Sequence, residues 1–184
     1  MYKCVQAPSV GRPDHSKGFT LIELMVTVAV FAIVVGIGVP NLVDTWRAWQ
    51  RDIATRAFVS HVQLARSEAI KASRRVVMCT SANGTTCAGN DNWAQGWIVF
   101  VDEDANQTPD NNRPVLVTQG PLTGLQRMNT ASAVGDFFFL PSGLMPSRAS
   151  TITIEPLGST SVEMTTITIS SSGRTRISKV ARGT

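Results

Sequence analysis

The sequence predicts an α+β fold, in which one long N-terminal helix packs on a head made of an antiparallel β-sheet or sandwich. Three observations predict it: a nearly unbroken apolar run over residues 19 to 39, a helical apolar pattern that continues to about residue 74, and several short β-rich runs after residue 75. The chain has 184 residues, of which 43% are hydrophobic and 16% charged. It therefore has room for one packed core and one apolar appendage.

The apolar run from Phe19 to Val39 contains 21 residues. As a helix it covers roughly 31 Å, which is enough to span the hydrocarbon core of a bilayer. Basic residues precede the run, so the positive-inside rule places the N-terminus in the cytoplasm and the head on the other side. In an ordinary secretory signal the small-residue cleavage site follows the apolar stretch, whereas here Gly18 precedes it. A cut at Gly18 therefore leaves the helix on the mature chain.

One carboxylate, Glu23, lies near the start of this run. An acid in a bilayer is costly unless it is paired or snorkels to the surface. The stretch KGFTLIEL, residues 17 to 24, resembles the processing site of type IV pilins and type II secretion pseudopilins. That resemblance implies that prepilin peptidase removes the leader, residues 1–18, by cleavage after Gly18, and that the new N-terminal Phe19 is N-methylated. Glu23 would then attract the amine of a neighbouring pilin, and this pair would select correct stacking more than add stability.

The helix is expected to continue beyond residue 39, although Pro40 lacks an amide donor and loosens the turn before it. Two apolar strips mark the continuation. The first lies within an arc of about 80° and contains Leu42, Trp46, Trp49, Ile53, Ala57 and Leu64. The second lies opposite, beside Arg47 and Arg51, and contains Ala54, Phe58, Ala65 and Ala69. Because the second strip suits packing on a domain, we expect a membrane or filament-core helix over 19–39, an amphipathic half over 40–75 and a β-rich head over 76–184.

Short β-rich runs dominate the chain after residue 75. They are VVMC (76–79), GWIVFVD (96–102), PVLVT (114–118), DFFFL (136–140), STITIE (150–155), TTITIS (165–170) and RTRIS (174–178). Turn residues separate these runs, as in ANGTT, PSG and SSG. Successive short strands with such connectors indicate an antiparallel sheet or sandwich and not alternating βαβ units.

The three cysteines are Cys4, in the leader, and Cys79 and Cys87, in the head. Loss of the leader leaves an even pair in a domain that the topology places outside the cytoplasm, where disulfides persist. We therefore expect a disulfide between Cys79 and Cys87, worth roughly 2 to 3 kcal/mol in chain-entropy terms. A zinc site is the weaker interpretation, because a tetrahedral site needs four ligands and no nearby histidine completes it.

The sequence offers no catalytic constellation. Its two histidines are His15, in the leader, and His61, on the long helix, and neither accompanies a nucleophile signature. No enzyme activity, cofactor or metal is therefore expected. The loop DEDANQTPDNN, residues 102 to 112, has the alternating acids of a calcium loop, but Arg113 stands where the bidentate glutamate would be. A solvated acidic connector is favoured over a calcium site.

Four blocks then carry a second resemblance. In chain order they are QLARSEAIK (63–71), Cys79 with Cys87, WAQGWIVFVDED (93–104) and SSGRTRIS (171–178). Together they are similar to the GspH/FimT family, over nearly the whole chain from Phe19 onward. The resemblance implies the type IV pilin fold and a minor subunit near the tip of a type IV pilus or a type II secretion pseudopilus. Trp93 and Trp97 are expected to serve the core of the head and not a ligand.

Residues 164 to 184 carry four cations, Arg174, Arg176, Lys179 and Arg182, and no acid. On a strand Arg174 and Arg176 project to the same face, where two planar guanidinium groups suit phosphates. The stretch GRTR, from Gly173 to Arg176, resembles the GRxR motif of FimT-type minor pilins, which bind DNA during natural transformation. Lys179 and Arg182 extend the basic stretch without matching a motif. The alternative is a basic edge strand whose charges prevent pairing with other chains.

The net charge of the chain does little to decide between a phosphate-binding site and a basic edge strand. Residues 1 to 18 hold three of the 17 basic and one of the 13 acidic residues, which leaves 14 against 12, a net charge of only +2. The local charge and the resemblance favour non-specific binding of extracellular double-stranded DNA through phosphate contacts. The alternatives are a GspH-like minor pseudopilin of a type II secretion system, without DNA binding, and an adhesive tip subunit.

The same resemblance implies the partners and the location of the chain. We expect a single pass through the inner membrane with a periplasmic head, followed by assembly with other major and minor pilins into a pilus or pseudopilus. The assembled subunit would lie near the tip and could face the outside of the cell.

Overall fold

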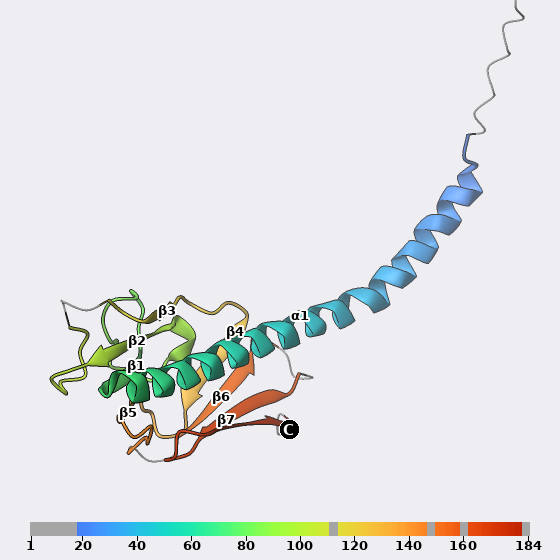
Figure 1. The fold of residues 1–184 in the computed structure, drawn as a ribbon. Coiled ribbons are helices and arrows are strands. Elements are labelled where there is room, and N and C mark those ends of the chain that lie inside the picture. The colour runs from blue at the N-terminus through green and yellow to red at the C-terminus, as the bar shows by residue number, and fades with distance from the viewer. Residues whose placement is uncertain (1–17, 111–113, 147–149, 159–161, 182–184) are drawn as a thin grey trace, which may run out of the picture. The chain divides into compact units, whose positions relative to one another are not determined.

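The computed structural model describes residues 18–110, 114–146, 150–158 and 162–181 (Figure 1). One long helix, α1 (Leu21–Ala72), precedes the strands. The strands are β1 (Arg75–Thr80), β2 (Trp97–Asp102), β3 (Val117–Gln119), β4 (Leu125–Thr130), β5 (Asp136–Phe139), β6 (Ser150–Pro156), β7 (Met164–Ile169) and β8 (Thr175–Val180), with a 3-10 turn at Trp93–Gln95. The chain divides into two compact units, residues 1–40 and residues 41–184. The predicted α+β class is confirmed.

The first unit contains the N-terminal part of α1. Its apolar side chains from Leu21 to Val39 are exposed, and the helix is long and apolar enough to cross a membrane by length and composition. The backbone N–H of Glu23 donates to Thr20 Oγ1 at 3.3 Å, so Thr20 caps the helix. The sequence predicts a helix that starts at Phe19, and α1 begins two residues later, at Leu21.

The second unit contains two four-stranded sheets, with strand orders β3-β2-β1-β5 and β4-β6-β7-β8. The paired strands in both are antiparallel. A short turn joins β7 to β8, whereas residues 81–96 separate β1 from β2 and residues 103–116 separate β2 from β3. Residues 54 to 69 of α1 contribute to the same packed core as the two sheets, and Figure 1 shows this part of the helix running beside the strands.

One core joins α1 to both sheets. Its largest fully buried side chains include Trp93, Trp97, Phe58, Phe137, Phe139, Met128, Ile152 and Ile154. The rings of Phe58 and Trp97 meet edge to face with centroids 5.4 Å apart. Burial of a phenylalanine of this kind contributes about 1.5 to 3 kcal/mol. The expectation that Trp93 and Trp97 serve the core is confirmed.

The two strips of the helix have different environments. The second strip lies in the core: Ala54, Phe58, Ala65 and Ala69 are all buried, together with Val62. Their spacing of three and four residues keeps them on one face of α1. In the first strip Trp46 and Trp49 remain 57% and 53% exposed, with ring centroids 5.1 Å apart. The first strip is therefore exposed at Trp46 and Trp49, whereas further along the helix Ala57 and Leu64 of the same strip pack partly against the core.

Two strands of the structure differ from those that the sequence predicts. Strand β4 has only Met128 and Thr130 buried among its six residues, and its pairing with β6 shifts register between Leu125 and Arg127. Such a polar, bulged strand lacks the alternation that marks a strand in a sequence. The run predicted over 114–118 forms a strand only from Val117 to Gln119.

Candidate functional site

The hairpin between β7 and β8 carries the predicted basic motif. Gly173 N–H donates to Ser170 O at 2.8 Å, and Ser170 N–H donates to Arg174 O at 2.9 Å. Gly173 has a φ of 72°, in the left-handed region. A short turn that ends in a left-handed glycine is a common way to close a hairpin. The backbone conformation of this turn therefore explains why the motif has a glycine at position 173.

Arg66 of α1 supports this turn. A Cβ atom on Gly173 would lie 2.9 Å from Gly143 O and 2.9 Å from Arg66 Cδ. Arg66 Nε donates to Gly143 O at 3.1 Å, and Met145 N–H donates to Ser171 O at 2.8 Å. The turn thus rests on the helix and on the 143–145 segment. No pattern in the sequence indicates this role of Arg66, because its contact with Gly143 lies 77 positions along the chain.

Arg174 and Arg176 are both exposed. Arg174 Nε donates to Ser172 Oγ at 3.2 Å, which orients the guanidinium at the turn. Arg176 pairs across the strands with Thr168 of β7, whose side chain is also exposed. Cross-strand partners share a face of the sheet. The face that carries Arg176 is therefore the outer face, away from the core.

Lys179 lies on the opposite face of β8. Its cross-strand partner is Thr165, which is buried on the core side. Lys179 and Ile177 line a shallow hollow of about 260 Å³, together with Asp52, Thr55, Arg56 and Thr165. A separation of three residues on a strand already places Arg176 and Lys179 on opposite faces. The structure does not bring Lys179 together with Arg176, and Arg182 falls outside the described residues.

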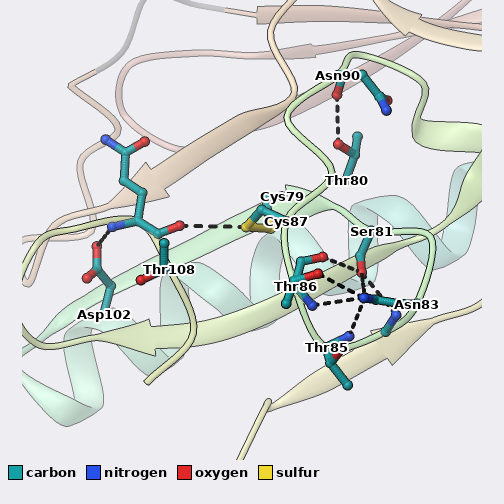
Figure 2. Close-up of a disulfide and its surroundings, with 12 residues drawn as sticks. Cys79, Thr80, Ser81, Asn83, Thr85, Thr86, Cys87, Asn90, Asp102 and Thr108 are labelled. Carbon is teal, nitrogen blue, oxygen red and sulfur yellow. Dashed lines mark hydrogen bonds between the residues drawn. A yellow bond between two sulfur atoms is a disulfide. The ribbon is translucent and has the colours of Figure 1, made fainter. Parts of the chain in front are cut away.

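The disulfide between Cys79 and Cys87 is confirmed, with a Cα–Cα distance of 5.6 Å (Figure 2). This bond engages both thiols, so the zinc interpretation of the pair is wrong. Hydrogen bonds fill the loop that it closes: Asn83 Oδ1 accepts from Thr85 N–H and Thr86 N–H, and Ser81 Oγ donates to Thr86 O. The disulfide and these hydrogen bonds therefore hold the loop after β1 in a compact conformation.

In the acidic loop after β2, the carboxylate of Asp102 binds groups of the protein itself. Asp102 Oδ2 lies 3.0 Å from Arg75 Nε, and the two oxygens of Asp102 accept from the backbone N–H groups of Asn106 and Gln107. The side chain of Asp102 is fully buried. Within the part of the chain that the structure describes, no three His, Cys, Asp or Glu side chains gather as a metal would require.

His61 contributes to packing between α1 and β2. Trp97 Nε1 donates to His61 Nδ1 at 3.0 Å, and burial lowers the pKa of His61 below its usual value. A neutral imidazole can accept this hydrogen bond, whereas an imidazolium cannot. The histidine therefore serves the core, and His15 lies outside the described residues.

Gly18 and Phe19, the predicted processing residues, lie at the start of the described chain. Phe19 is 81% exposed, and the space around Gly18 is open. Glu23 occupies the first turn of α1, where a carboxylate also favours the helix N-terminus. This local role is independent of the assembly role predicted for Glu23.

Two family profiles match the chain. That of the type II transport protein GspH covers residues 54–173, and that of the prokaryotic N-terminal methylation motif covers residues 14–39. The GspH match ends at Gly173, so Arg174 and Arg176 lie just beyond it. The match spans more than half of the chain.

Known proteins show the same similarity. The pilin-like protein PilA1 of Thermus thermophilus is 28% identical over 143 residues, which are 75% of this chain and 84% of PilA1. The fold is similar to that of the minor pilin FimU of Pseudomonas aeruginosa, with a TM-score of 0.55, 21% identity and coverage of 70% and 87% of the two chains. It is also similar to the minor pseudopilin EpsH of Vibrio cholerae, with a TM-score of 0.51, 16% identity and coverage of 71% and 97%.

Proposed function

Since the chain belongs to the GspH family of minor pilins and pseudopilins, we propose that it is a minor type IV pilin that binds extracellular double-stranded DNA for uptake in natural transformation. The observation that supports this proposal most is the hairpin between β7 and β8. It holds Arg174 and Arg176 exposed at a turn that Gly173 and Arg66 fix. No acid occurs in the sequence from Met164 to the C-terminus.

The chemistry of this site suits phosphate. A guanidinium group presents a planar set of donors that matches phosphate oxygens in a bidentate way and stays charged at any physiological pH. Contacts of this kind position a duplex without reading its sequence. Binding should therefore be non-specific and should weaken steeply with salt, because each neutralised phosphate releases counterions.

The first prediction concerns the two arginines. In the Arg174→Gln/Arg176→Gln variant we expect weaker binding to every duplex, and the slope of log K against log salt should become shallower by about 1.8, at about 0.9 for each lost phosphate contact. Fluorescence anisotropy of a labelled duplex of about 30 base pairs with the full processed chain in uncharged detergent measures both quantities.

A matched control removes the same charge elsewhere. Lys71 and Arg74 are exposed cations near the C-terminal end of α1, so the K71Q/R74Q variant has the same net charge. We expect it to keep the salt slope of the parent chain. Equal slopes for the two double variants would remove Arg174 and Arg176 from the site.

The N-terminus supports a proposal on processing and assembly. We infer that prepilin peptidase cleaves after Gly18, that Phe19 becomes the methylated N-terminus, and that Glu23 pairs with the Phe19 amine of a neighbouring subunit. The methylation motif over residues 14–39 supports this. Residues 1–18 would then be the leader, 19–39 the membrane and filament-core helix, 40–75 the amphipathic half and 76–184 the head.

The location follows from the same features. Before assembly the apolar part of α1 holds the chain in the inner membrane, and the positive-inside rule puts the head in the periplasm. After assembly the head is carried on a pilus with other pilins. A disulfide in the head suits an oxidising compartment.

A second candidate is a structural minor pseudopilin of a type II secretion system. The family profile that matches is that of the type II transport protein GspH, and it ends before the two arginines. In this role the head contacts secreted proteins or other minor subunits and binds no DNA. A parent chain that fails to bind duplex DNA at low salt would favour this candidate.

A further inference from the structure

The outer face of the sheet β4-β6-β7-β8 carries two rows of polar side chains. The first row crosses three strands and consists of Arg176, Thr168 and Thr151, which are successive cross-strand partners. The second row, two residues further along the strands, consists of Ser178, Thr166, Thr153 and Asn129. None of these seven side chains is buried. Within a row neighbouring strands lie about 4.8 Å apart, and the rows lie about 6.8 Å apart.

The first row joins the basic motif to a pair of hydroxyl groups. Thr151 Oγ1 and Thr168 Oγ1 lie 3.3 Å apart. Each hydroxyl has one donor, and only one of the two can donate to the other. One O–H of this pair therefore stays available to an acceptor above the face, directly beside the strand that carries Arg176.

Charge is distributed unevenly along this face. Together the two rows contain guanidinium, hydroxyl and amide groups. The acids of β6 and of the segment before β7, Glu155 and Glu163, come at the other ends of these strands, away from the 170–173 turn. Glu155 also forms an ion pair with Arg127 Nη2 at 2.5 Å. At the β4 end of the second row, Asn129 Nδ2 donates to Asp91 Oδ2 at 3.3 Å, so a carboxylate also lies there. The part of the face that suits an anion is therefore the first row, next to the turn.

Threonine is common in strands, so a threonine face alone indicates no ligand. Here, however, the hydroxyl pair is in register with Arg176 and continues the surface that the motif begins. We propose that this face forms part of the DNA site and that Thr168 and Thr151 donate to phosphates of the backbone that Arg174 and Arg176 hold. The inference rests on the proposed DNA binding, and it adds neutral contacts to the charged ones.

Salt separates the two kinds of contact. A hydroxyl releases no counterion when it binds phosphate, whereas an arginine does. We expect the Thr151→Val/Thr168→Val variant to bind the duplex about three- to tenfold more weakly, the usual range for lost hydrogen bonds, with the salt slope of the parent chain. The measurement is the same anisotropy titration with the full processed chain at several salt concentrations.

Thr175 supplies the matched control. It lies between the two arginines, but its cross-strand partner is the buried Ile169, so it belongs to the core side of the sheet. Thr175→Val should leave the affinity unchanged. Unchanged affinity in the Thr151→Val/Thr168→Val variant would overturn this inference and leave the proposed function intact. A parent chain that binds no DNA at low salt would instead contradict the proposed function.

A pair of glutamate variants covers the case in which the valine variant folds poorly. Thr168 and Thr118 are both exposed strand residues, and Thr118 belongs to the other sheet. Thr168→Glu and Thr118→Glu change the net charge equally. We expect Thr168→Glu to weaken binding more than about tenfold relative to Thr118→Glu, because its carboxylate would face the phosphates directly. Equal affinities of these two folded variants would also overturn the inference.

Discussion

Gly173 combines a backbone requirement with a packing requirement. Its φ of 72° is unfavourable for residues with a Cβ, and a Cβ there would lie 2.9 Å from Gly143 O. Gly89 has a similar φ of 66° with nothing within 4 Å of its Cβ position. These two glycines therefore separate the conformational cost from the steric cost.

We expect Gly89→Ala to lower the free energy of unfolding by about 1 to 2 kcal/mol, the cost of a left-handed conformation. Gly173→Ala should cost about 1 to 3 kcal/mol more, because its Cβ meets backbone that cannot move aside easily. Urea unfolding monitored by tryptophan fluorescence compares the two. Equal losses would contradict the proposed fit of the turn against Arg66 and Gly143.

For single residues, the sequence predicts chemical roles better than it predicts tertiary contacts. The cations at 174 and 176 and the cysteine pair could be recognised from residue type and spacing. The role of Arg66 could not, because it depends on a fold that brings residues 66, 143 and 173 together. Lys179 extends the basic stretch in the sequence, but its strand position puts it on the other face of β8 from Arg176.

Among the elements, α1 is joined to β2 by a hydrogen bond that depends on pH. His61 accepts from Trp97 while it is neutral, and its folded-state pKa is lowered by burial. A histidine with a depressed folded pKa stabilises the fold above its unfolded pKa of about 6.5, and this stability is lost as the pH falls. The interface between helix and sheet should therefore weaken in acid.

The test compares the parent chain with His61→Gln, which keeps an acceptor for Trp97 but does not titrate. Between about pH 7.5 and pH 5 the thermal midpoint of the parent should fall more than that of the variant. The difference between the two profiles isolates His61 from Asp136, whose pKa burial raises while Arg75 opposes the rise. Parallel profiles would show that the Trp97 hydrogen bond does not control stability.

Elements with strong periodicity were predictable. The length of α1 and its buried strip follow from apolar residues at spacings of three and four. Strand β4 was not predictable, because it buries only two of its six side chains and carries a register shift. Its place in the sheet comes from pairing with β6 and not from its own pattern.

For the molecule as a whole, the α+β class and the family could be inferred from sequence, because the N-terminal motif and the order of the blocks are specific. The division of the strands into two sheets could not, since short polar-rich runs do not encode their neighbours. Function is predictable to the level of a minor pilin or pseudopilin. The proposed DNA binding of the C-terminal hairpin depends on side chains that strand pairing brings to one face, which the linear order of residues does not show.

The most direct measurement is a salt titration of the unmodified, processed full chain with two duplexes of equal length and unrelated sequence. We predict equal affinities for the two duplexes at each salt concentration. We also predict a steep fall in affinity between about 50 and 200 mM salt, about a thousandfold if six phosphates are contacted and less for fewer. Absence of binding at the lower salt concentration, or a strong preference for one duplex that salt does not weaken, would contradict the proposed non-specific DNA binding.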